Sequence, residues 1–131
     1  MAATGTGSFE NDDALDWVWE LKEAEDTFIL EDTLSQVIDG DDYIEAPECC
    51  CAIAAAEVVA ALLRRPVDNL PDDVATYVAQ IGVAPSKKLV GLALRALDRI
   101  KSNSELQELW SDSAEADTWF ASIEELEERL S

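Results

Sequence analysis

Four carboxylates lie close together in the segment between residues 39 and 45: Asp39, Asp41, Asp42 and Glu45. Carboxylate oxygens are the ligands that hard cations such as Ca²⁺ prefer, so this segment is a candidate divalent-metal site. Its spacing lacks the glycine at the sixth position and the terminal bidentate glutamate of an EF-hand loop. We therefore expect a solvated acidic loop, with weak binding of a divalent cation as the alternative.

The sequence contains no histidine, which removes several kinds of catalytic chemistry. Serine–histidine and cysteine–histidine nucleophile pairs cannot form, and neither can a zinc site with histidine ligands. An enzyme would have to use Asp, Glu, Lys or Tyr side chains, and paired catalytic carboxylates lie too far apart in sequence to leave a local signal. The sequence favours a protein that is not an enzyme, and it indicates no catalytic residue and no cofactor.

Three adjacent cysteines, Cys49, Cys50 and Cys51, are the only thiols. Neighbouring side chains on a helix point about 100° apart, so these three do not form a Cys-x-x-Cys metal or redox pair. An odd number of cysteines without a secretory signal favours a reducing compartment, and we expect a cytoplasmic protein. The cysteines are predicted to act as small apolar residues at a helix start, with one of them exposed enough to be oxidised.

The glycine-rich opening is a further candidate for chemistry, because Gly5 and Gly7 are separated by one residue. A Gly-x-Gly turn before a helix can bind phosphate through its backbone N–H groups. Acidic residues crowd this opening, however, and neither Gly-Lys-Ser nor Gly-Lys-Thr follows it. We do not expect a phosphate site here.

The structural interpretation of the opening is a partly extended turn over residues 1–10 that delivers Phe9 to the core. Asn11 then caps the first helix with its side-chain oxygen. Asp12 lies in the first turn of that helix, where its charge faces the positive end of the helix dipole. The opening is therefore predicted to be a structural motif.

Charge is the compositional anomaly of the chain. It contains 29 Asp and Glu against 9 Lys and Arg, for a net charge of −20. Residues 1–48 carry 15 acids and one base, residues 49–103 carry 5 acids and 7 bases, and residues 104–131 carry 9 acids and one base. Such a charge disfavours nucleic acid and anionic membranes as partners, and it favours a basic protein.

The pattern of apolar residues predicts an all-α protein, because they recur at helical spacing and no segment alternates with period two for long enough to form a strand. With 131 residues, the chain fits one compact domain, residues 1–131, with a single core. We expect six or seven helices, with Ser86 capping the fifth and Ser104 and Gln107 forming a capping box for the sixth. The expected helices cover about residues 12–22, 27–39, 47–63, 74–81, 87–101, 105–110 and 115–130.

The segment 47–63 is apolar almost all round and rich in alanine, which is typical of a central helix wrapped by others. Its one charged residue from position 49 onward is Glu57. An unpaired carboxylate among apolar neighbours would be costly, so we expect Glu57 to be buried and paired with Arg95 or Arg99. The alternative is that Glu57 lies on a solvated stripe of this helix.

Two stretches carry a resemblance to a known family. The first is the opening Gly5-Thr6-Gly7-Ser8-Phe9-Glu10-Asn11-Asp12, and the second is Ala54-Ala55-Ala56-Glu57-Val58-Val59-Ala60-Ala61. The first is similar to the Gly-x-Gly-x-Phe-x-Asn-Asp pattern of small, acidic, mostly bacterial proteins grouped as domain of unknown function 4259, and the second resembles the central helix of that family. Members usually carry a tryptophan before the first glycine, where this chain has Thr4. The resemblance implies coverage of the whole chain, and it implies no activity because the family has none established.

Two classes of function follow from these observations. The first is a non-catalytic, acidic, helical interaction protein that binds a basic partner, in the manner of immunity proteins that neutralise cationic toxins or of acidic mimics of nucleic acid. The alternative is a small protein that binds a divalent metal through carboxylates, or hydrolyses a substrate with them, in which Asp39, Asp41, Asp42 and Glu45 or Glu57 hold the ion. The sequence favours the first class.

Overall fold

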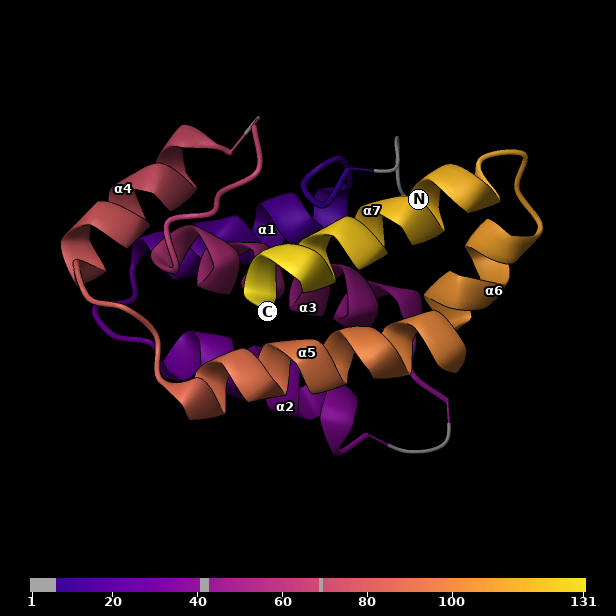
Figure 1. The fold of residues 1–131 in the computed structure, drawn as a ribbon, viewed down its shortest axis with the longest axis horizontal. Coiled ribbons are helices and arrows are strands. Elements are labelled where there is room, and N and C mark those ends of the chain that lie inside the picture. The colour runs from indigo at the N-terminus through magenta and orange to yellow at the C-terminus, as the bar shows by residue number, and fades with distance from the viewer. Residues whose placement is uncertain (1–6, 41–42, 69) are drawn as a thin grey trace.

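Seven α-helices and no strand make up the secondary structure of the part of the chain that the computed structural model describes, which is residues 7–40, 43–68 and 70–131 (Figure 1). The all-α prediction is confirmed. The helices are α1 (Asp12–Lys22), α2 (Phe28–Ile38), α3 (Ala46–Leu62), α4 (Asp72–Ile81), α5 (Lys87–Ser102), α6 (Glu105–Ser111) and α7 (Ala116–Leu130).

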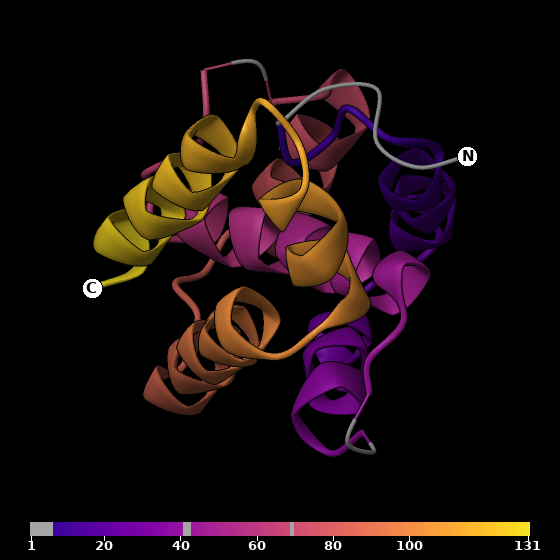
Figure 2. The same cartoon turned by 90° about the vertical axis from the view of Figure 1, so that its right-hand side faces the viewer.

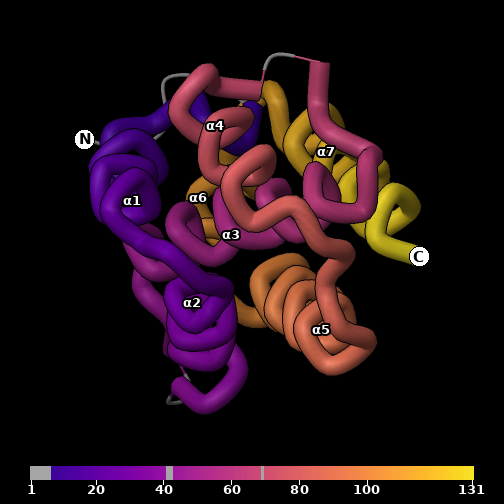
Figure 3. The backbone as a smooth tube through the Cα atoms, turned by 90° about the vertical axis from the view of Figure 1, so that its left-hand side faces the viewer, coloured from indigo at the N-terminus to yellow at the C-terminus, as the bar shows by residue number. Residues whose placement is uncertain are grey.

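The alanine-rich helix α3 lies at the centre of the bundle, as predicted. It contacts each of the other six helices, and 13 of its 17 residues are buried. Figure 3 shows α3 ringed by α1, α4, α7, α5 and α2, and Figure 2 shows α6 from the opposite side of the bundle. The small alanine side chains let neighbouring helices approach closely, and each of the other helices packs against α3.

Polar side chains cap the N-termini of three of the helices. Asn11 Oδ1 accepts a hydrogen bond from the backbone N–H of Ala14 at 2.8 Å, and Ser86 Oγ accepts one from Leu89 at 3.1 Å. Both predicted caps are confirmed. Ser104 Oγ likewise accepts from the backbone of Gln107, but the Gln107 side chain donates to Ser111 instead of returning to the cap. The predicted capping box is therefore only half formed.

Helix α3 ends in a left-handed residue that is not glycine. Arg64 has a φ of +67°, and its backbone N–H donates to the carbonyl of Ala61 while that of Arg65 donates to Ala60, both at 2.9 Å. This pair of bonds is the Schellman arrangement that satisfies the last carbonyls of a helix. The left-handed conformation is unfavourable for a residue with a side chain, so the chain carries local strain at Arg64.

We expect Arg64→Gly to stabilise the protein by about 0.5–1 kcal/mol, because relief of the left-handed strain exceeds the added entropy of the unfolded chain. Urea unfolding followed by circular dichroism measures the change. Arg64→Ala removes the same charge but keeps the strain, so it should bring no gain. Gly82 ends α4 with a φ of +64°, and Gly82→Ala should therefore destabilise. Equal stability of Arg64→Gly and Arg64→Ala would contradict the strain.

Candidate functional site

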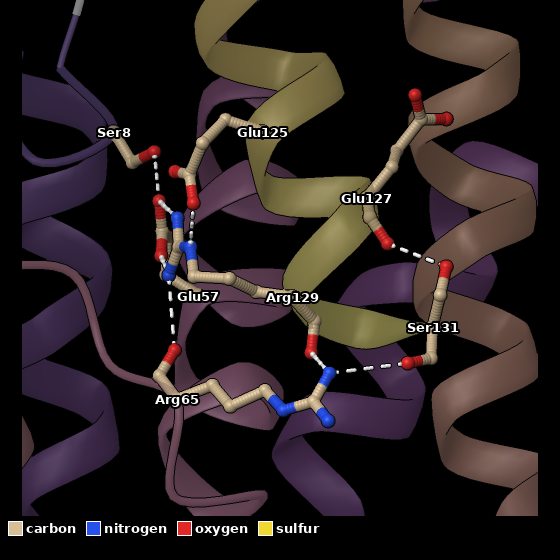
Figure 4. Close-up of polar contacts among 7 residues, drawn as sticks. All are labelled: Ser8, Glu57, Arg65, Glu125, Glu127, Arg129 and Ser131. Carbon is tan, nitrogen blue, oxygen red and sulfur yellow. Dashed lines mark hydrogen bonds and ion pairs between the residues drawn. The ribbon is translucent and has the colours of Figure 1, made fainter.

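A buried ion pair lies beside the middle of the bundle. Glu57, in the second half of α3, is 2% exposed, and Arg129 reaches it from the last turn of α7. The guanidinium donates from Nη1 to Oε1 at 2.9 Å and from Nη2 to Oε2 at 3.2 Å, which is the two-pronged geometry that makes such pairs strong (Figure 4). Glu57 is thus buried and paired, but its partner is Arg129 and not Arg95 or Arg99 of α5.

Three other segments join this pair. Ser8, in the opening turn, donates its hydroxyl hydrogen to Glu57 Oε2 at 2.6 Å. Arg129 donates from Nε to Glu125, one turn earlier in α7, and from Nη1 to the carbonyl oxygen of Arg65 at 3.1 Å. The pair therefore fastens the opening turn, α3, the segment after α3 and α7 to one another.

Arg65 completes the connection in the opposite direction. Its Nη1 donates to the carbonyl oxygens of Arg129 at 3.3 Å and of Ser131 at 3.1 Å (Figure 4). The side chain of Arg65 thus holds the end of α7, while the side chain of Arg129 holds the backbone of Arg65. This reciprocal arrangement also satisfies carbonyls at the end of α7 that lack a partner within the helix.

The polar contacts of this cluster stabilise the fold. Burial disfavours the charge of Arg129, but the carboxylates of Glu57 and Glu125 outweigh that effect and raise the pKa of Arg129 above its ordinary value. Three of the roughly four lone-pair positions of the Glu57 carboxylate accept hydrogen bonds from Arg129 and Ser8. Glu57 therefore keeps little capacity to bind a metal ion or a substrate.

The acidic segment proposed as a metal site is only partly described. Asp39 is exposed at the end of α2, and Glu45 is exposed just before α3, whereas Asp41 and Asp42 lie outside the described residues. Within residues 7–40, 43–68 and 70–131, no group of three or more Cys, Asp or Glu side chains is placed to hold a metal ion. The structure therefore gives no support to metal binding among the carboxylates that it describes.

The other residues of the opening motif have local structural roles where they are described. The backbone N–H of Gly7 donates to the Glu10 side chain at 3.1 Å and so closes a turn. Phe9 is half-buried against the core, and the cap residue Asn11 is buried. Asp12 is exposed in the first turn of α1, and Gly5 lies outside the described residues.

The three cysteines are free thiols on the first half of α3. Cys49 and Cys50 are buried, and Cys51 is partly buried with its thiol near the carbonyl oxygen of Asp13. Burial raises the pKa of Cys49 to about 11, of Cys50 to about 12 and of Cys51 to about 11. Because the thiolate is the reactive form, all three are poor nucleophiles at neutral pH.

A family model described as Domain of unknown function (DUF4259) matches residues 2–122. The chain belongs to this family. Both stretches that carry the resemblance fall within the match, and Ser8 of the first stretch donates directly to Glu57 of the second. No curated protein matches the chain, and no solved structure does. None of the helices in the described part of this family member is long and apolar enough to cross a membrane.

Removing either partner of the buried pair should destabilise the protein by about 3–5 kcal/mol, because the other charge is left uncompensated. We expect Arg129→Met to cost more than Glu57→Leu, since Glu57 pairs with no other cation among the described residues, while Arg129 keeps Glu125. The double variant should recover much of the loss. Chemical unfolding of the four proteins gives the coupling energy.

A matched control comes from the pair of Lys101 and Glu127, whose side chains are 24% and 22% exposed. Its double-mutant cycle should give a coupling of only about 0–1 kcal/mol, because solvent screens exposed charges. Equal coupling energies for the two pairs would contradict the dominant role of the Glu57–Arg129 pair.

Native thiols should react slowly with iodoacetamide at pH 8. A pKa of about 11 leaves about one Cys51 thiol in a thousand as thiolate at that pH, and a pKa of about 12 leaves fewer at Cys50. Mass spectrometry of quenched samples should show Cys51 labelled first and all three labelled rapidly once the protein is unfolded in urea. Rapid labelling of the native protein at Cys50 would contradict the burial of these thiols.

Proposed function

We propose that this protein is a non-catalytic interaction protein that binds a basic protein partner through the outer face of α1. The proposal rests on one observation above all. That face presents a largely exposed tryptophan, Trp19, among carboxylates that form no ion pair within residues 7–40, 43–68 and 70–131.

The acidic excess of the chain stays on its surface. Among the described residues the ion pairs are Lys22–Asp73, Lys101–Glu127 and the two that Arg129 makes with Glu57 and Glu125. These pairs engage four carboxylates, whereas all but two of the 29 Asp and Glu of the chain lie in the described part. The negative field therefore acts on the solvent, where it attracts a cationic partner and accelerates its association.

The outer face of α1 combines this charge with apolar area. Leu15 is 46% exposed and Trp19 is 67% exposed. Asp12, Asp16 and Glu20 are exposed on the same helix, and Glu23 is exposed at its C-terminal cap, at spacings that place them around Leu15 and Trp19. The neighbouring Trp17 faces the interior and donates from Nε1 to Thr33 of α2 at 2.9 Å, so the two tryptophans lie on different faces of α1.

Trp19 is suited to contact cations. The Nζ atom of Lys22 lies 4.1 Å from the centroid of its ring, so the face of the indole already accepts a cation. An exposed tryptophan is also among the residues that most often contribute large shares of binding energy at protein interfaces. An arginine or lysine of a basic partner can take the same position. A partner that normally binds nucleic acid would meet a surface that mimics phosphate charge.

The alternative, a carboxylate site for a divalent metal or for hydrolysis, has no specific observation in its favour. The buried carboxylate Glu57 is engaged by Arg129 and Ser8, and Asp39 and Glu45 are exposed and belong to no described metal-binding group. We therefore propose binding to a partner as the function.

The test is to cross-link partners in the native cell, to purify the basic protein that is captured, and to measure its affinity for variants. Trp19→Ala should weaken binding about tenfold or more, as expected for a central interface residue. Asp16→Asn combined with Glu20→Gln should lower the association rate and its dependence on salt.

Matched controls come from other exposed residues of the chain. Phe28→Ala removes an exposed aromatic side chain from α2, and Glu124→Gln with Glu128→Gln removes two charges from α7. These variants should bind as the parent does. Unchanged affinity of Trp19→Ala and of the α1 charge variant would refute the proposed face, and failure to capture any basic protein would refute the function.

A further inference from the structure

A groove lined by apolar and cationic side chains lies away from the acidic face of α1. It has a volume of about 510 Å³ and is formed by the end of α3, the first half of α5 and the last turn of α7. Figure 1 shows the end of α7 beside α5, with α3 behind them. Its apolar lining includes Leu63, Val90, Leu94 and Leu130. Both the volume and the apolar lining are typical of sites for small molecules.

The charged side chains that line the groove are both cationic, those of Arg65 and Lys87. No Asp or Glu is among the lining residues, although the chain has a net charge of −20. Lys87 forms no ion pair within the part of the chain that the structure describes. Arg65 uses only its Nη1 atom for the described hydrogen bonds to Arg129 and Ser131, so its other guanidinium nitrogens remain available.

Gly91 supplies an independent observation. It lies inside α5, where a glycine destabilises the helix relative to alanine, and it lines the groove. A Cβ atom at this position would meet nothing within 4 Å. Packing among the described residues therefore does not require the glycine. Its absent side chain widens the groove and lets another molecule approach the backbone of α5.

We propose that this groove binds a small amphipathic carboxylate, with an acyl chain against Gly91 and the apolar lining and its carboxylate near Arg65 and Lys87. The apolar walls account for the chain of the ligand, and the two cations account for its charged end. A small molecule with one negative charge suits this protein better than an acidic protein, because the charge of −20 repels a highly charged partner over a long range. This site is independent of the partner-binding face proposed for α1.

Decanoate is the probe, and binding to the full chain is measured by calorimetry and by chemical-shift changes in NMR spectra. Decanoate should bind to the parent, and uncharged decanol should bind at least about fivefold more weakly because it lacks the charge contact. Lys87→Gln should weaken decanoate binding about fivefold while leaving the unfolding midpoint unchanged. Equal binding of decanol and decanoate would overturn the role of the two cations.

Gly91→Leu fills the groove and should abolish decanoate binding. Because nothing lies within 4 Å of the new Cβ and a helical glycine is removed, this variant should keep the circular dichroism spectrum of the parent and unfold at a midpoint no lower than that of the parent. Ala121→Leu, at an exposed position of α7, is the matched control and should bind decanoate normally. Trp19→Ala should also bind normally, which separates this proposal from the one on α1.

Two other outcomes would overturn the proposal. One is that decanoate does not bind to the parent, or binds to Gly91→Leu as tightly as to the parent. The other is that the parent dimerises in sedimentation experiments and Gly91→Leu does not, in which case the groove is an interface between two copies of the chain.

Discussion

A carboxylate inside an apolar helix is the constraint on which the rest of this bundle depends. Glu57 lies in α3, which contacts every other helix, and burial of its charge is tolerable only with a cation at hydrogen-bonding distance. Arg129 supplies that cation from the end of α7, and it can do so only if α7 packs against α3. The requirement to neutralise one side chain thus fixes where the last helix lies, and Ser8 extends the same requirement to the opening turn.

The use of Arg129 inside the structure has a consequence for the surface. It is the only base among residues 104–131, which carry nine acids. Apart from Arg129 itself, the base that pairs with this segment in the described structure is Lys101. Of the bases of the middle segment, Lys101 pairs with Glu127, whereas Arg65 donates from Nη1 to backbone carbonyl oxygens and Lys87 forms no ion pair with a described residue. Charge is therefore sorted into separate regions, with an acidic face on α1 and a cationic groove at the end of α3. Two faces of opposite charge can bind two different kinds of molecule.

The helices, three of their caps and the central position of α3 could be predicted from the sequence, because each depends on residues within a few positions of one another. The burial of Glu57 could also be predicted from its apolar neighbours. Its partner could not, because Arg129 is 72 residues away and the composition pointed to the basic helix α5. The lone base in an acidic segment, one turn after Glu125, was the available signal. The groove depends on how three separate segments pack and left no local pattern.

The two stretches that carry the family resemblance meet in the structure, and their meeting accounts for both without reference to function. The hydroxyl of Ser8 in the opening donates to the carboxylate of Glu57 in the alanine-rich stretch, while Asn11 caps α1 and Phe9 packs against the core. These contacts engage Ser8, Asn11 and Glu57 inside the bundle, whereas Asp12 of the first motif is exposed on the face of α1 that carries Trp19. The surfaces proposed for binding, around Trp19 and in the groove at Gly91, therefore lie mostly outside the two motifs. A search for the activity of this chain should therefore begin with its exposed side chains, since the family signature describes how the bundle is held together.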